Sequence, residues 1–306
     1  MITTRTCGAI TWINLESPTR DEVVAIAKEY GLHSLVTEEL TTPTLRPKVD
    51  IYPDYLYLIL HFPPVAYADI LTPKDREIDF IIGKRFIITT HYEALDADMA
   101  FAALFEESNV FPSSHMCDTH SGFIFYKMIK NLYGHITTRI DAIQQDIKDV
   151  EEQIFHGLEH RMVREISVIG RKLLDIHIST TQHGTVLDSF KEAGGVFFGK
   201  EFSYYLSAIT SEYAKMHAAL QSNRETLTEL RITNDSLLNT KTNSIIKTLT
   251  IMAFVTYPLA LIAGIFGMNT ESAPIVGMPN DFWFILGGMT IVTLTFFSVF
   301  KYKRWL

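Results

Sequence analysis

The residues of this chain best suited to ion chemistry lie at the end of a long charge-free segment. Gly264 and Gly267 expose backbone carbonyls there, and Asn269 adds a side-chain carbonyl. A ring of such neutral oxygens could hold a hydrated cation through its water molecules, loosely enough to release it again. If the segment is a helix, its C-terminal end adds partial negative charge at the same place. The pattern therefore suits loose binding of a hydrated cation.

Two segments near the C-terminus, residues 249–266 and 282–300, contain no charged residue. Each has about the ~20 residues that cross a ~30 Å hydrocarbon core as a helix. A buried core helix is the alternative, but lysine flanks each segment at one end only, which favours a membrane. We therefore predict two transmembrane helices.

The basic residues around these segments predict their orientation. Lys241 and Lys247 precede the first segment, residues 301–306 form a basic tail after the second, and the loop 267–281 has neither lysine nor arginine. Positive charge is retained on the cytoplasmic side of membranes. We expect a multi-pass protein of the cytoplasmic (inner) membrane with both termini in the cytoplasm.

The first membrane segment continues a much longer helical pattern. No proline occurs between Pro112 and Pro258, and no glycine between Gly199 and Gly264. An unbroken helix from residue 201 to residue 266 would be about 100 Å long at ~1.5 Å per residue. Only about a third of that length fits in a ~30 Å bilayer core, so the rest must form a cytoplasmic stalk.

The first part of the chain is typical of an α/β domain. Strand-like segments lie at 9–15, 55–62, 77–82 and 85–91, and Ser17-Pro18 predicts the N-cap and first turn of a helix that ends at Gly31. Farther along, apolar residues at three- and four-residue spacing predict a helix that turns near Gly157 into a second one, from Glu159 to about Phe190.

These patterns divide the chain into seven parts, which together predict an α+β/α membrane protein. They are a cytoplasmic α/β domain (1–115), an antiparallel helical pair (116–198), a stalk helix (199–248), a first transmembrane helix (249–266), an outer loop (267–281), a second transmembrane helix (282–300) and a basic tail (301–306).

Composition excludes several classes of function. The chain has 27 Lys and Arg against 35 Asp and Glu, and of the acidic residues only Glu271 and Asp281 follow residue 240. An acidic cytoplasmic domain argues against nucleic acid as a partner. Two cysteines predict no disulfide framework, as in a reducing compartment. The sequence shows no nucleophile, base and orienting group in a pattern typical of an active site. We therefore do not expect an enzyme, nor a covalently bound cofactor.

One face of the predicted first membrane helix carries small or polar groups. Spacings of three and four residues place seven of them together. They are Asn243, Ile246, Thr250, Ala253, Tyr257, Ala260 and Gly264. Such a face could line a water-filled path formed by several copies of the helix. Close packing of helix against helix would explain the small residues equally well.

A family resemblance supports the first alternative. Residues 263–269, Ala-Gly-Ile-Phe-Gly-Met-Asn, resemble the signature of the CorA family of magnesium transporters, together with Leu249-Thr250-Ile251 and Pro258-Leu259 before them. Phe266 stands where the family more usually has tyrosine. The order Trp12-Ile13-Asn14, followed by residues 46–49 before a Tyr-rich strand, is similar to the amino-terminal domain of such proteins.

The resemblance implies a pentameric funnel, a homopentamer in which the first membrane helix lines the pore. It implies that Gly267, Met268 and Asn269 form the outer selectivity site and that Asn243 forms a polar ring at the inner mouth. Ile246 and Leu249 are candidates for a hydrophobic gate. Tyr257 stands where the family often has methionine.

Acidic residues have two further candidate roles. Glu271 and Asp281 in the outer loop could concentrate cations at the pore mouth by steering. The family often has Met-Pro-Glu in this loop, whereas Asn280 follows Met-Pro here. Members of the family are thought to sense cytosolic magnesium through acidic side chains between neighbouring soluble domains, one of them on the stalk. The expected position holds Ile232, and Asp235, one turn nearer the membrane, is our candidate for a regulatory metal ligand.

Two groups of histidines could bind a softer metal. His156 and His160 share a helical spacing, and His115, Cys117, Asp118 and His120 lie close in sequence. A zinc site needs three or four converging ligands, so we favour solvated or capping roles for both groups.

The leading interpretation is a channel or transporter that moves Mg²⁺, and possibly Co²⁺ or Ni²⁺, across a lipid membrane. One alternative is a zinc transporter of the same fold, with or without proton coupling, in which Zn²⁺ replaces Mg²⁺ as the transported and regulatory ion. A second is a non-conducting membrane sensor or scaffold, against which the small residues Ala253, Ala260 and Gly264 argue.

Overall fold

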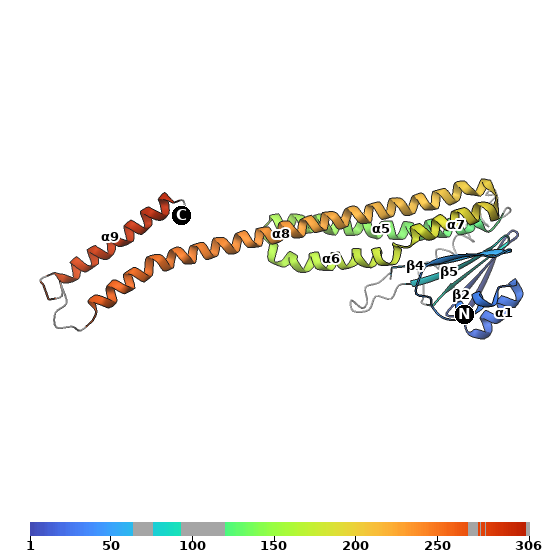
Figure 1. Cartoon of the computed structure of the whole chain (residues 1–306), viewed down its shortest axis with the longest axis horizontal. Coiled ribbons are helices and arrows are strands. Elements are labelled where there is room, and N and C mark those ends of the chain that lie inside the picture. Colours follow the sequence, from blue (N-terminus) through green and yellow to red (C-terminus); the bar gives the residue numbers. More distant parts are fainter. Residues whose placement is uncertain (64–75, 93–119, 269–274, 276, 279, 304–306) are drawn as a thin grey trace. The chain divides into compact units, whose positions relative to one another are not determined.

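The computed structural model describes residues 1–63, 76–92, 120–268, 275, 277–278 and 280–303. The chain forms two compact units, Met1–Arg231 and Ile232–Leu306. One helix belongs to both units, and the division falls within the predicted stalk, residues 199–248 (Figure 1).

A six-stranded sheet forms the centre of the first unit. Its strands are β1 (Ile2–Cys7), β2 (Ile10–Glu16), β3 (Lys48–Ile51), β4 (Tyr55–Phe62), β5 (Arg76–Gly83) and β6 (Phe86–His91). Their order is β1-β2-β6-β5-β4-β3, with β2 and β6 parallel and the other described pairs antiparallel. The four predicted strands are confirmed as β2, β4, β5 and β6. The two edge strands escaped prediction because they are largely exposed or half-buried and lack the apolar runs of buried strands.

Two short helices, α1 (Arg20–Tyr30) and α2 (Ser34–Glu39), cover one face of the sheet. The N-cap of α1 is Thr19 and not Ser17 as predicted, because Thr19 and Glu22 form a reciprocal capping box. The hydroxyl of Ser17 instead donates to the carbonyl of Tyr92 (2.8 Å). Gly31 ends the helix in the left-handed conformation, as expected.

The other face of the sheet packs on the helices α5 (Gly122–Phe155), α6 (Glu159–Thr180) and α7 (His183–Phe198). Phe80 meets Phe125 of α5 edge to face, with ring centroids 5.3 Å apart, and Phe62 meets Tyr133 at 6.3 Å. All eight residues of β4 are buried, since both faces of the sheet are covered.

The second predicted helix, from Glu159 to about Phe190, is two helices. The chain breaks at Thr181 and Gln182, between α6 and α7. Ser179, Thr180 and Thr181 all donate their hydroxyls to carbonyls four residues earlier. Such bonds compete with the helical ladder and bend helices, so a run of three at this point accounts for the break.

The expectation of no disulfide is corrected at Cys7, the last residue of β1, which is disulfide-bonded. Cys117 is the only other cysteine of the chain and lies outside the described residues.

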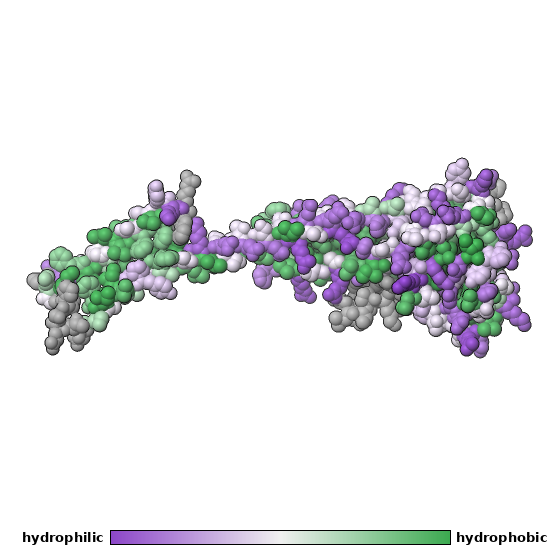
Figure 2. All heavy atoms as spheres, in the orientation of Figure 1, coloured by the Kyte–Doolittle hydropathy of each residue, from purple (hydrophilic) through white to green (hydrophobic). Residues whose placement is uncertain are grey.

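The predicted long helix is confirmed. A short 3₁₀ turn (Lys200–Phe202) leads into α8 (Ser203–Phe266), which has 64 residues. The last helix is α9 (Asp281–Tyr302). Both contain a segment long and apolar enough to cross a membrane, with mean hydropathy 2.1 and 1.9. Figure 2 shows hydrophobic surface gathered on the end of α8 and on α9, whereas the surface of the first unit is mixed.

Candidate functional site

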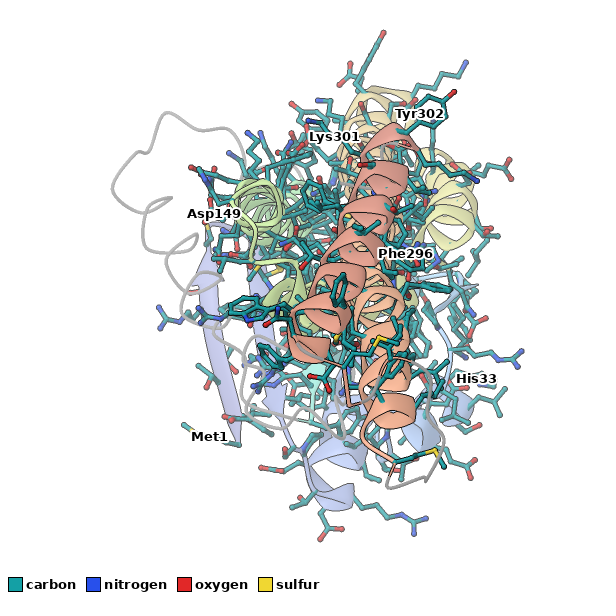
Figure 3. The ribbon with its side chains drawn as sticks, turned by 90° about the vertical axis from the view of Figure 1, so that its left-hand side faces the viewer. Met1, His33, Asp149, Phe296, Lys301 and Tyr302 are labelled. Carbon is teal, nitrogen blue, oxygen red and sulfur yellow. The ribbon has the colours of Figure 1, made fainter. Side chains whose placement is uncertain are left out.

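Within the second unit, α9 runs back beside the end of α8 (Figure 1). Each helix has one line of partly or fully covered residues at three- and four-residue spacing, which places them on one face. These residues are Ile251, Val255, Pro258, Ile262 and Phe266 on α8, and Ile285, Met289, Val292, Phe296 and Phe300 on α9. The two helices therefore meet through apolar faces. Figure 3 shows Phe296 on α9, and Lys301 and Tyr302 at its end.

The predicted pore face of α8 lies on the other side of the helix. Five of its seven residues are exposed, and Thr250 and Ala253 are half-buried. At about 100° per residue, its centre is roughly 150° from the centre of the covered face. Contact with α9 thus leaves the small and polar face of α8 open to contacts outside the chain.

Three large side chains on or beside this face are strongly exposed. The exposed fractions of Ile246, Leu249 and Tyr257 are 54%, 60% and 74%. The Thr250 hydroxyl donates to the carbonyl of Ile246 (2.8 Å), so its lone pairs remain available to a water molecule. Pro258 lies inside the helix and, having no N–H, cannot donate to the carbonyl four residues earlier.

The end of α8 requires a glycine at position 267. The Gly267 amide donates to the carbonyl of Ala263 (2.9 Å), and the Met268 amide donates to Ile265 (3.3 Å). A Cβ atom on residue 267 would lie 2.8 Å from the Ala263 oxygen, closer than real Cβ contacts allow. Gly264 differs, because the space around its missing Cβ is open.

Two predicted site residues, Asn269 and Glu271, lie outside the described residues. Asp281 is described as the first residue of α9. Its carboxylate accepts hydrogen bonds from the amides of Gly277 (3.0 Å) and Phe282 (2.7 Å). The acid therefore closes the turn before α9 and satisfies the positive end of that helix, in addition to carrying charge.

The inner candidates lie on α8 before the membrane segment, where Asn243 and Asp235 are both exposed. Within the described part of the chain, no group of three or more His, Cys, Asp or Glu residues could hold a metal ion. One chain thus assembles no described regulatory metal site around Asp235.

One histidine of each candidate group contacts neighbouring residues of the protein. The His156 ring lies 3.7 Å from the Glu152 carboxylate on the exposed end of α5. The Nδ1 atom of His120 accepts the Gly122 amide (3.2 Å), and its ring stacks on Phe123 and Phe198 with centroids 4.7 and 4.6 Å away. Burial lowers the pKa of His120. The capping role is confirmed for His120.

One polar cluster was missed by sequence reasoning. Glu77 and Asp79 lie on β5, a strand that is otherwise apolar after its first residue, and both are buried. The signal available in the sequence was two acids at alternate positions of a predicted strand, which places them on the same face.

Comparison with known proteins connects this geometry to a family. The family model described as CorA-like Mg²⁺ transporter protein matches residues 8–304. The cobalt/magnesium transport protein CorA of Thermotoga maritima is 24% identical over 97% of this chain and 83% of its own length. That of Methanocaldococcus jannaschii is 21% identical over 96% and 91%.

The fold agrees with a solved structure of this kind. The complete structure of the CorA magnesium transporter from M. jannaschii superposes with a TM-score of 0.81, covering 97% of this chain and 92% of that one at 20% identity. The charge-free end of α8, the glycine-dependent turn after it and the match along almost the whole chain lead to one conclusion: the chain belongs to the CorA-like Mg²⁺ transporter family.

Proposed function

We propose that this chain is the subunit of a homopentamer that conducts Mg²⁺ across the cytoplasmic membrane, with both termini in the cytoplasm. The observation that carries the proposal is the position of the small and polar face of α8, on the side away from the face that meets α9. Two helices cannot enclose a path alone, so this face must be shared among copies around an axis. The names of the relatives, cobalt/magnesium transport proteins, support Mg²⁺ as the cargo.

The outer end of α8 is the proposed selectivity site. Mg²⁺ gives up its water reluctantly, so a site that passes it quickly should contact the ion through retained water. The carbonyls at the end of α8 and the side chain of Asn269 supply neutral acceptors, and the helix dipole adds partial negative charge. Met268 completes the Gly-Met-Asn triplet.

The inner half of the same face is the proposed gate. Rings of Ile246 and Leu249 would form an apolar constriction that closes by excluding water, and Asn243 would form a polar entry below it. Thr250, Ala253, Tyr257 and Ala260 line the path between gate and selectivity site. A potential of ~100 mV, negative inside, supplies about 4.6 kcal/mol for a divalent ion, so no nucleotide is needed.

The route of regulation is also a proposal. Asp235 is exposed on α8 and belongs to no described group of three or more His, Cys, Asp or Glu residues that could hold a metal within its own chain. A regulatory ion at Asp235 would therefore need ligands from a neighbouring subunit.

The test is ion-specific uptake into proteoliposomes that hold either a magnesium or a zinc dye, with voltage and pH gradient set separately. Voltage alone should drive Mg²⁺ entry. Zinc entry that grows with a proton gradient would identify Zn²⁺, and not Mg²⁺, as the transported ion. If an intact pentamer took up neither ion, the result would contradict conduction and favour a scaffold.

A further inference from the structure

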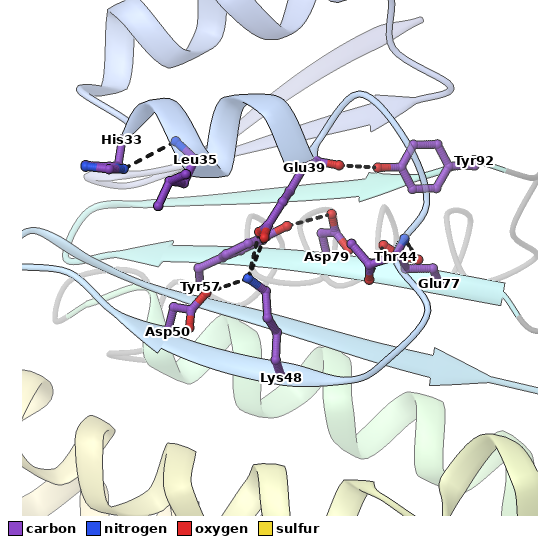
Figure 4. Close-up of polar contacts among 10 residues, drawn as sticks. All are labelled: His33, Leu35, Glu39, Thr44, Lys48, Asp50, Tyr57, Glu77, Asp79 and Tyr92. Atoms are coloured by element: carbon purple, nitrogen blue, oxygen red, sulfur yellow. Dashed lines mark hydrogen bonds and ion pairs between the residues drawn. The ribbon is translucent and has the colours of Figure 1, made fainter.

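The polar cluster on β5 is buried on the face of the sheet that α1 and α2 cover. Asp79 has no exposed surface, and Glu77 is 5% exposed. Antiparallel register places His61 of β4 directly opposite Glu77 and Ile59 opposite Asp79, so Tyr57 lies diagonal to Asp79. Figure 4 shows Tyr57, Glu77 and Asp79 close together beneath α2, with Glu39 reaching down from α2 and Lys48 reaching up from β3.

Glu77 is surrounded by donors. Its Oε2 atom accepts the Thr44 amide (2.6 Å), its Oε1 atom accepts the Thr44 hydroxyl (3.1 Å), and the His61 Nε2 atom lies 3.4 Å from Oε2. His61 Nε2 also donates to the Thr44 carbonyl (3.0 Å). Both carboxyl oxygens of Glu77 therefore have a donor from Thr44. Glu77 thereby anchors the loop between α2 and β3 to the sheet.

Asp79 is in the opposite situation. The Tyr57 hydroxyl donates to its Oδ2 atom (3.2 Å), but no described donor reaches Oδ1. If both acids were ionised, Oδ1 would be a buried, unsatisfied charge beside a second negative charge, which is costly. A proton on Asp79 would remove one of the two charges and give its carboxyl group a donor toward Glu77. Burial raises the pKa of Asp79 well above its usual range, and the charge of Glu77 raises it further.

The other charged and titratable groups around the pair do not replace this proton. The Lys48 ammonium is held by Glu39 (2.7 Å) and Asp50 (2.6 Å). The Tyr92 hydroxyl donates to the Glu39 carbonyl (3.3 Å). Among the described residues, no group of three or more His, Cys, Asp or Glu residues could hold a metal ion here. A proton fits the pair better than a metal ion.

We propose that Glu77 and Asp79 form a proton-binding site, and that its single proton keeps the α2–β3 loop fastened through Thr44. Loss of the proton places two negative charges side by side in the sheet and weakens the hold of Glu77 on the loop. The cytoplasmic domain thereby carries a device that opens this loop as the pH rises.

The test measures unfolding of the full chain in detergent against pH, for the natural protein and for Asp79→Asn. Asparagine keeps the shape of the side chain and can accept from Tyr57. Its NH₂ group can donate to Glu77 at any pH, so it does not need to be protonated. Because the folded-state pKa of Asp79 is raised, its stabilising effect is complete below the unfolded pKa near 4 and is lost as the pH rises toward the folded pKa. The unfolding constant of the natural protein, relative to the variant, should grow about 10-fold per pH unit in this window.

Asp54→Asn is the matched control, because Asp54 is an exposed acid just before β4. This variant should follow the natural protein. Parallel pH curves for the natural protein and Asp79→Asn would overturn the proposal. So would stabilisation by MgCl₂ that requires Asp79, because the pair would then bind a cation.

Two measurements on the natural protein guard against a variant that fails to fold. Infrared difference spectra recorded across the same pH window should show a protonated carboxyl signal that disappears as the pH rises toward the folded pKa of Asp79. Hydrogen exchange of the segment around Thr44, corrected for its intrinsic pH dependence, should accelerate over the same range. Absence of the carboxyl signal at the lower pH would contradict the site.

Discussion

At the scale of single residues, the functional hypothesis depends most on Asn269. Asn269→Ala removes the neutral side-chain oxygen proposed to hold the hydrated ion, so Mg²⁺ uptake should fall by about 100-fold or more. The assembly should stay intact, because the change removes a small polar side chain and leaves the apolar faces of α8 and α9 as they are. Ser272→Ala in the same loop is the control and should transport normally. Undiminished uptake by Asn269→Ala would exclude it from the selectivity site.

Gly267 offers a second test at this scale. An added methyl group would meet the Ala263 oxygen at 2.8 Å and must shift the last turn of α8. Gly267→Ala should therefore lower Mg²⁺ uptake by about 10-fold or more, because the selectivity site follows directly. Gly287→Ala in α9, where the space is open, should leave uptake unchanged. Equal uptake by both variants would show that the turn tolerates displacement.

At the scale of elements, the open face of α8 makes a directional prediction. Thr250 lies on the proposed pore face and Thr256 lies off it, although both donate their hydroxyls to carbonyls four residues earlier (2.8 and 2.9 Å). Thr250→Leu should narrow and dry the path and lower uptake about 10-fold, whereas Thr256→Leu should change it less than about twofold. A larger loss of uptake in Thr256→Leu than in Thr250→Leu would place the pore face on the Thr256 side of the helix.

The N-terminal elements depend on interactions of a different kind. The helix α1 is fixed by the capping box of Thr19 and Glu22, and α2 by its loop to the buried carboxyl pair. These contacts explain how two short helices cover one face of the sheet. They also place the proposed proton site in the N-terminal domain, in a part of the chain outside the two membrane segments, so its response to pH can be measured apart from transport.

At the scale of the whole molecule, conduction requires several copies. The uncovered face of α8 cannot form a closed path in one chain, so several copies must share it. The CorA resemblance implies five copies, and the purified protein should therefore assemble as a pentamer in mild detergent. Mass measurement of the intact complex checks this count. A stable monomer that still transports Mg²⁺ would contradict the shared pore.

The sequence by itself determined the membrane segments, the long helix and the Gly-Met-Asn motif. These are local properties, since charge-free length, the absence of proline and glycine, and residue order are enough to specify them. The positions of β4, β5 and β6 along the chain followed in the same way from their apolar runs.

Only the tertiary structure decided which residues meet across the chain. It placed the cap of α1 at Thr19 and divided the predicted second helix into α6 and α7, where three side-chain hydroxyls compete for backbone carbonyls. It also showed which face of α8 is covered. The pairing of Glu77 with Thr44, 33 residues away, depends on strand register and loop closure. Such long-range contacts follow from packing that no local pattern encodes.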